Sequence, residues 1–91
     1  MPVVRIPTVL RKHTDGAAKI EVSGSDVGEV LRGLVAAHPG LSEQLFDGDK
    51  VRGFINVYLD DEDIRYLDGL ASPVGDDAEN ALMPAVAGGA G

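Results

Sequence analysis

The chain has 91 residues, 44% of them apolar, and a formal net charge of −7 at pH 7. This length suffices for one domain with a modest core and is too short for two. Because nucleic acids and anionic membranes bind basic surfaces, the acidic balance argues against both as partners and favours docking onto basic protein surfaces.

The sequence contains no cysteine, which excludes a disulfide framework, a thiolate metal site and a cysteine nucleophile. Residues 1–5 lack the basic leader and long apolar run of a signal peptide. No apolar run approaches the roughly 20 residues of a membrane span. We therefore expect a cytoplasmic protein.

The first half of the chain predicts two strands and a helix. Apolar alternation predicts strands over residues 3–6 and 19–22, separated by a polar loop at 11–16. Ser25 is the expected helix N-cap, and the helix ends at His38, before a proline. One apolar helix face follows from the spacing of Val27, Val30, Leu31, Leu34 and Val35.

The second half predicts a short helical turn over residues 41–46 and then strands. The clearest strand covers 53–59 and is followed by a turn at 60–63, a short returning strand at 64–66 and a last strand at 80–85. Interleaved strands with one long helix predict an α+β fold, a mixed sheet packed on that helix.

The last seven residues, AVAGGAG at 85–91, carry no charged or long side chain. Such a segment has almost nothing to bury, and glycine lets a partner approach its backbone closely. We predict a compact domain over residues 1–84 and a flexible tail over 85–91 whose backbone threads into a narrow channel on another protein.

Four blocks carry a resemblance: IPTVLR at residues 6–11, FINVYLDDEDIR at 54–65, GLA at 69–71 and MPAVAGG at 83–89. Together they make the chain resemble the ubiquitin-like sulfur carriers of the β-grasp fold. These include the small subunit of molybdopterin synthase, the thiamin-pathway carrier and, most of all, the actinobacterial carriers for cysteine biosynthesis. A lone Gly-Gly is a weak signal, but the middle block and the PAVAGG ending are specific together.

The resemblance implies a substrate of other enzymes, without a bound cofactor, and not a catalyst. An activating enzyme would use ATP to adenylate Gly89, the second residue of the Gly88-Gly89 pair, and a sulfur nucleophile would then form a thiocarboxylate. The implied acceptor enzyme is a pyridoxal-phosphate cysteine synthase that uses an activated serine. Delivery to molybdopterin, to a thiazole or to a natural product stays open.

Two positions depart from the family pattern. Members usually end at the diglycine, whereas Ala90-Gly91 follow it here. We therefore predict a precursor cut between Gly89 and Ala90, and the resemblance points to a zinc metalloprotease that brings its own zinc; the alternative is that the extra residues are tolerated. The second departure is polar Asn80, where an apolar residue usually stands.

The same residues are compatible with two other functions. A covalent protein modifier also uses an activated diglycine, and a non-covalent binding module would carry an inert tail. We expect His13 and His38 to be surface histidines, and residues 60–63 to be a solvated turn without the glycine and later Glu of a calcium loop. No metal site is expected.

The side chains that alternate with the core face of the 53–59 strand predict a docking surface. If the helix covers the core face, Phe54 and Tyr58 lie on the open face of the sheet, with Met83 on the same side. The predicted surface continues into Ala85, Val86 and Ala87 and places the tail in a partner's active site. The alternative is a set of ordinary edge aromatics.

Overall fold

The structure is a computed structural model that describes residues 1–84. Residues 85–91 lie outside the described part, so the division into domain and tail stays a prediction. The sheet strands are β1 Val3–Arg5, β2 Lys19–Glu21, β5 Ile55–Leu59, β6 Glu62–Asp63 and β7 Glu79–Pro84, and β3 Phe46–Asp47 and β4 Lys50–Val51 form a separate hairpin. The helices are α1 Val27–Ala37 and α2 Ser42–Leu45, with 3-10 turns η1 Thr8–Thr14, η2 Pro39–Leu41, η3 Ile64–Tyr66 and η4 Gly69–Ala71.

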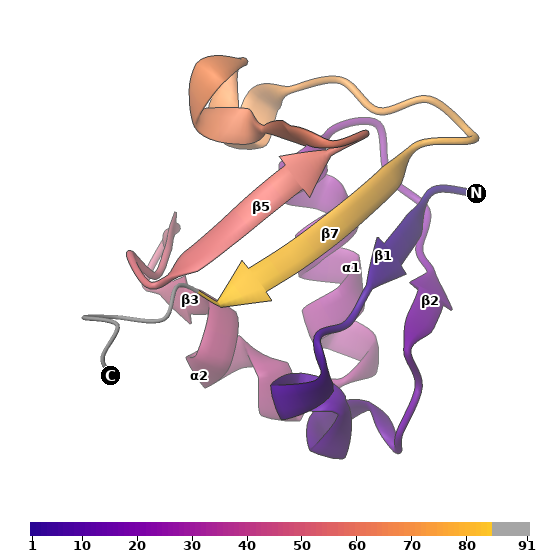
Figure 1. Cartoon of the computed structure of the whole chain (residues 1–91), viewed down its shortest axis with the longest axis vertical. Coiled ribbons are helices and arrows are strands. Elements are labelled where there is room, and N and C mark those ends of the chain that lie inside the picture. Colours follow the sequence, from indigo (N-terminus) through magenta and orange to yellow (C-terminus); the bar gives the residue numbers. More distant parts are fainter. Residues whose placement is uncertain (85–91) are drawn as a thin grey trace.

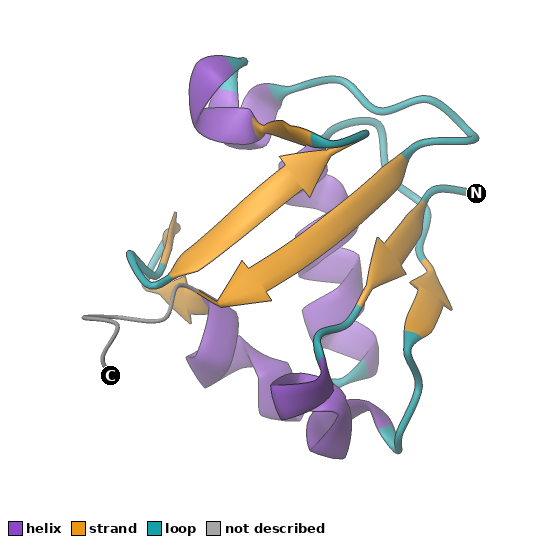
Figure 2. Ribbon diagram, viewed as in Figure 1, coloured by secondary structure: helices purple, strands orange, loops and turns teal. Residues whose placement is uncertain are grey.

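The five strands form one mixed sheet in the order β2-β1-β7-β5-β6 (Figure 1). The neighbours β1 and β7 run parallel, and every other pair in this sheet is antiparallel. Helix α1 crosses one face of the sheet (Figure 2). The predicted α+β architecture is confirmed. Strands β1 and β7, which lie near the two ends of the described chain, are neighbours in the middle of the sheet.

Helix α1 forms where the apolar periodicity predicted it, and Val27, Val30, Leu31 and Leu34 on its inner face are fully buried. Its N-cap is Asp26 and not Ser25. The Asp26 Oδ1 accepts a hydrogen bond from the Glu29 N–H at 2.8 Å, while a Glu29 carboxylate oxygen accepts from the Ser25 N–H at 2.7 Å. This reciprocal arrangement satisfies two backbone donors, one of them at the helix start.

Several short elements were not predicted, among them a 3-10 helix near the start of the chain and a hairpin after α2. Residues 8–14 form the 3-10 helix η1, which overlaps the expected loop, because Leu10 and Thr14 are buried. The hairpin β3–β4 follows α2 and turns at Gly48, whose φ of +66° suits glycine.

The predicted arrangement after β5 is wrong by a few residues. Asp60 and Asp61, with φ of +50° and +72°, form the turn, so β6 pairs directly back onto β5. The expected returning strand at 64–66 is the 3-10 helix η3, capped by Asp63, which accepts a hydrogen bond from the Arg65 N–H at 2.9 Å. The last strand begins at Glu79, one residue earlier than expected.

One apolar core lies between the sheet and α1. Its members include Val4, Ile6, Leu31, Leu34, Leu41, Leu45, Val57 and Leu82. Asn80 belongs to β7, is fully buried beside Val4, and its Oδ1 has no hydrogen-bond partner within residues 1–84. The departure noted in the sequence therefore places an amide with an unpaired carbonyl oxygen in the core.

Candidate docking surface

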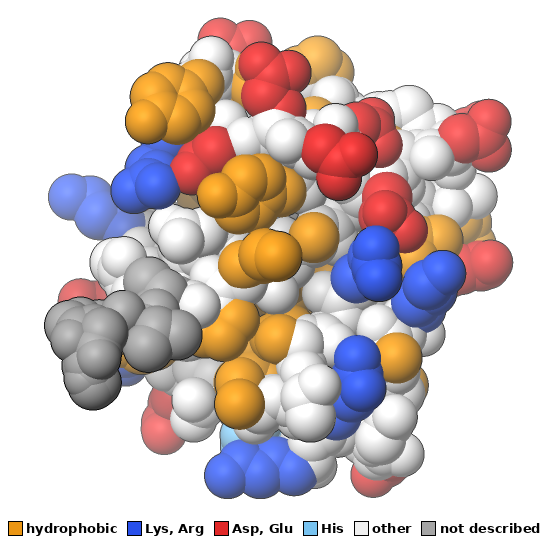
Figure 3. Space-filling view, in the orientation of Figure 1, with side chains coloured by type: hydrophobic (Ala, Val, Ile, Leu, Met, Phe, Trp, Pro, Cys, Tyr) orange, Lys and Arg blue, Asp and Glu red, His pale blue; other side chains and the backbone are white. Residues whose placement is uncertain are grey.

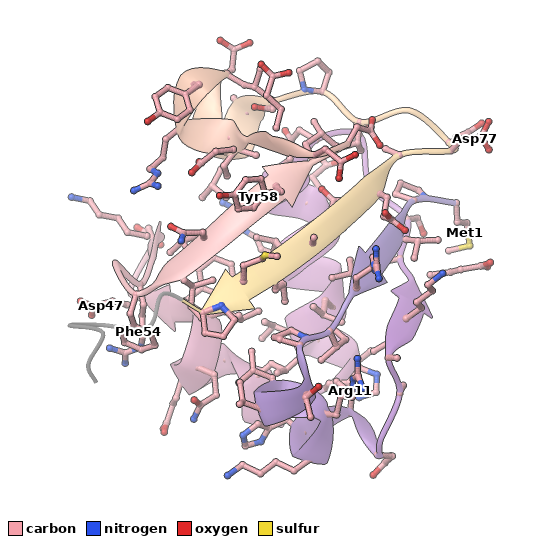
Figure 4. All side chains as sticks on the ribbon, viewed as in Figure 1. Met1, Arg11, Asp47, Phe54, Tyr58 and Asp77 are labelled. Atoms are coloured by element: carbon pink, nitrogen blue, oxygen red, sulfur yellow. The ribbon has the colours of Figure 1, made fainter. Side chains whose placement is uncertain are left out.

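The face of the sheet opposite α1 is open, and the neighbouring strands β7 and β5 form much of it. Ile55, Val57 and Leu59 are buried, whereas Asn56 and Tyr58 between them are half-buried. Figure 4 shows Tyr58 on the side of β5 that faces away from α1. The predicted assignment of the two strand faces is confirmed for residues 55–59, whereas Phe54 precedes the strand, which begins two residues later than predicted.

Strand β7 adds Met83 to the same face. Met83 pairs with Asn56, and Ala81 pairs with Tyr58, so both β7 residues lie on the open face. Met83 is 51% exposed, while Leu82 beside it is buried in the core. A long apolar side chain therefore stands near the end of the last described strand.

Phe54 lies at the edge of this surface. It directly precedes β5 and is 48% exposed, and the Arg52 guanidinium carbon lies 6.0 Å from the centre of its ring. Because β5 is antiparallel to β7, Phe54 lies at the end of the sheet where β7 reaches Pro84 (Figure 4). We call Phe54, Tyr58 and Met83 the docking surface.

The predicted tail residues lie outside the described part of the chain: Ala85, Val86, Ala87, Gly88, Gly89 and Ala90. The structure does show where the chain leaves the sheet. Pro84, the last described residue, pairs with Ile55 at the start of β5. The last described residue therefore lies next to Met83 and close to Phe54.

A groove beside the docking surface was not predicted. It is an open hollow of about 760 Å³ over β1, β7 and the start of η1, with Tyr58 and Met83 among its lining residues. Arg5, Arg11 and Lys19 also line it, together with the acids Asp61 and Glu79. Because Arg5 alternates with the apolar residues Val4 and Ile6, the sequence could predict that its side chain points away from the core. Only the fold shows that the three cations line one groove.

Tyr66 is a second exposed feature that the sequence did not assign to the surface. It is 81% exposed and follows the Asp63–Arg65 pair. Asp63 is only 7% exposed, and its Oδ2 lies 2.7 Å from the Arg65 Nη2. The hydrogen bonds from Arg65 lower the pKa of Asp63, and the same contact raises the pKa of Arg65.

The histidines differ from expectation in one respect. His13 lies in η1 and is half-buried, with a buried Nε2 that has no partner, because a close contact with Gly40 packs η1 against η2. His38 is the C-cap of α1 and is also half-buried. Within residues 1–84, no group of three or more His, Asp or Glu side chains is placed to hold a metal ion.

No helix in the described part of the chain is both long and apolar enough to cross a membrane.

A mixed sheet with parallel β1 and β7 at its centre and one main helix across it defines the ubiquitin-like β-grasp class. The model of the ThiS family matches residues 4–89, and the chain belongs to this family. It is 43% identical over 89 residues to the sulfur carrier protein CysO of Mycobacterium tuberculosis, covering 94% of this chain and 96% of the relative. It is 36% identical over 63 residues to small archaeal modifier protein 3 of Haloferax volcanii, covering 69% and 68%.

Solved structures agree with this assignment. A crystal structure of the BexX/CysO complex of Amycolatopsis orientalis matches with a TM-score of 0.90 and 40% identity, over 97% of this chain and 99% of that chain. CysO of M. tuberculosis matches with a TM-score of 0.87 and 39% identity, over 94% and 100%. The small archaeal modifier protein 1 of Methanosarcina acetivorans matches at 0.88 and 30%, over 96% and 94%.

Proposed function

We propose that this chain is a sulfur carrier that accepts sulfur at Gly89 and donates it in biosynthesis. The single observation that carries the proposal is the family match, which runs from Val4 to Gly89 and so includes the diglycine. The relatives named sulfur carriers support it, because their likeness covers 94% of this chain.

The chemistry follows from the poor reactivity of a carboxylate at neutral pH. The Gly89 carboxylate attacks the α-phosphorus of ATP on an activating enzyme, and pyrophosphate leaves. A sulfur nucleophile then attacks the acyl carbon of the adenylate and AMP leaves, which yields a thiocarboxylate. Gly88 and Gly89 carry no side chain to obstruct a narrow channel around this carbon.

The docking surface suits this role because it adjoins the exit of the tail. A partner that covers Tyr58 and Met83 contacts Met83 directly before Pro84, the residue that leads into residue 85. The chain thus acts as a substrate presented to other enzymes, and we infer that it is not itself a catalyst. We place it in the cytoplasm, where the activating enzyme has ATP.

We further propose that Ala90-Gly91 are removed before activation, by a zinc metalloprotease that cuts between Gly89 and Ala90. The family match stops at Gly89, which supports this. The experiment incubates the full chain and a chain ending at Gly89 with purified activating enzyme and ATP, without protease, and measures pyrophosphate release. The shorter chain is expected to react and the full chain not to. Equal reaction of both would remove the processing step and leave the carrier role standing.

The proposed acceptor enzyme is a pyridoxal-phosphate cysteine synthase. The likeness to relatives named CysO supports this choice over delivery to a cofactor or a natural product. Deletion of the gene is expected to abolish growth without cysteine in a strain whose other cysteine routes are closed. Normal growth with loss of a sulfur-containing metabolite would point to a different acceptor.

A covalent modifier is the second candidate, because two of the relatives with this fold are named small archaeal modifier proteins. A modifier would transfer the Gly89 carbonyl to lysine amines of other proteins. Its signature is a ladder of higher-mass conjugates formed with the activating enzyme and ATP. A carrier that is not a modifier gives none.

A further inference from the structure

The groove beside the docking surface is basic at one end. Arg5 of β1 pairs directly with Lys19 of β2, and Arg11 of η1 completes the set of cations along the groove. Figure 3 shows Lys and Arg side chains gathered on the open face on the side of β1 and β2. In a chain with a net charge of −7, this is a local exception.

These cations differ in how they are held. Arg5 Nη1 lies 3.6 Å from a Glu79 carboxylate oxygen, with both side chains about half-exposed. Arg11 donates from Nε to the Ile6 carbonyl at 3.0 Å, which fixes its guanidinium near the groove. Lys19 is exposed and makes no ion pair or side-chain hydrogen bond within residues 1–84. The Lys19 ammonium and the outer donors of Arg11 are therefore presented to a partner.

The basic end of the groove lies on the side of β1 and β2, where Arg5 and Lys19 are level with Ala81, and the groove also reaches Met83 and Pro84. Because β1 is parallel to β7, the residues that follow β1, from Ile6 to Arg11, lie at the same end as Met83 and Pro84. Of the two acids that line the groove, Glu79 contacts Arg5, and Asp61 lies in the turn between β5 and β6. Figure 3 shows Asp and Glu side chains gathered around the end of β5 and the start of β7. The open face is therefore basic on the side of β1 and β2 and acidic around the end of β5.

We propose that the basic end of this groove binds an acidic segment of the activating enzyme and so sets the angle at which the tail enters its channel. The inference rests on the sulfur-carrier function proposed above. Complementary charges at the rim of an interface raise the association rate and penalise a wrong orientation. A carrier rotated on the docking surface would bring the acidic segment against the acids of the β5–β6 turn, Asp60 and Asp61, and be repelled.

The proposal also refines the expectation drawn from the net charge. Overall acidity favours a basic partner surface, and that fits the acidic part of the open face. On the side of β1 and β2 the required complement is acidic. The activating enzyme should therefore present carboxylates opposite Arg11 and Lys19 and cations opposite the end of β5.

The test compares two charge reversals in the chain that ends at Gly89, Lys19→Glu in the groove and Arg32→Glu on α1. Both change the net charge by the same amount, and Arg32 is exposed on the helix that covers the opposite face of the sheet. The readout is pyrophosphate release by purified activating enzyme, as kcat and KM separately. Circular dichroism and thermal unfolding check that both variants fold.

We expect Lys19→Glu to raise KM about 10-fold at about 0.1 M salt with little change in kcat, and Arg32→Glu to raise it no more than about 2-fold. The difference should shrink at about 1 M salt, where the Debye length falls from about 10 to about 3 Å. Arg5→Gln should shift KM in the same direction as Lys19→Glu.

Equal KM values for the two reversals would overturn the groove assignment and leave the carrier function standing, since the wild-type chain would still be adenylated. An effect of Lys19→Glu on self-association alone would assign the groove to a second copy and also overturn the proposal. If the chain that ends at Gly89, without further substitutions, releases no pyrophosphate, both the proposed function and the inference are contradicted.

Discussion

Asn80 is a polar side chain in the centre of the sheet, and its environment makes a prediction about stability. Its Nδ2 is 3.5 Å from the Val3 carbonyl, and its Oδ1 is buried without a partner. A buried unsatisfied polar atom costs about 1–3 kcal/mol. Asn80→Val should therefore raise the free energy of unfolding by about 1 kcal/mol, measured by urea denaturation.

The matched control is Asn56→Val, a half-buried position on the open face. It changes strand propensity in the same way but removes no buried amide. A loss of stability in Asn80→Val would show that this amide is satisfied in solution, for example by a buried water.

The docking surface and the core respond to different substitutions. Phe54→Glu and Met83→Glu replace side chains that are about half-exposed, so the fold should stay intact. Binding to the activating enzyme should weaken by 10-fold or more, because the contact would bury an unpaired charge. Titration calorimetry measures the affinity. Unchanged affinity with either variant would remove that residue from the contact.

Core truncations should show the reverse pattern. Leu34 is fully buried in α1, and Ile55 is buried at the start of β5. Leu34→Ala and Ile55→Ala should each lower the free energy of unfolding by about 2–5 kcal/mol through the cavity they leave. Urea denaturation measures this, and a loss below about 1 kcal/mol would mean that the side chain is less well packed than described.

Asp63 links stability to pH. Its pKa is lowered in the folded chain by hydrogen bonds from Arg65. The stabilisation is therefore complete above the unfolded-chain pKa of about 3.9 and is lost as the pH falls through the lower folded value. Asp63→Asn should reduce the loss of unfolding free energy between about pH 5 and pH 2 relative to wild type. An identical fall in unfolding free energy over this pH range in the two proteins would contradict this.

At the scale of elements, the N-terminus of α1 depends on one side chain. Asp26 Oδ1 satisfies the Glu29 N–H, and the carboxylate also lies at the positive end of the helix dipole. Asp26→Ala should cost about 1 kcal/mol of unfolding free energy, whereas Ser25→Ala should cost much less because Asp26 is the cap. Equal losses of unfolding free energy in the two variants would contradict the assignment of Asp26 as the cap.

The elements that could be predicted are those that obey one strong period. α1 shows the 3.6-residue repeat from Val27 to Leu34, and β5 alternates over its full length. The β5–β6 turn depends instead on positive φ at Asp60 and Asp61, for which the sequence gives little warning. η1 forms because tertiary packing buries Leu10 and Thr14 within a polar segment.

At the scale of the whole molecule, the exposed face of β5 and β7 was predictable and the groove was not. That face follows from alternation along the two strands, which local sequence contains. The groove needs Arg5, Arg11 and Lys19 to meet from three elements, and the parallel pairing of β1 with β7 places them in the same groove as Met83 and Pro84. Pairing between distant segments is a property of topology, not of local pattern.

The central claim is that Gly89 becomes a thiocarboxylate, and intact mass measures this directly. The chain ending at Gly89 is incubated with purified activating enzyme, ATP and a sulfide source, with omission of ATP as the control. We predict an ATP-dependent mass gain equal to the exchange of one oxygen for one sulfur, located at Gly89 by fragmentation. An unchanged mass, or conjugates to other proteins without a thiocarboxylate, would contradict the sulfur-carrier function.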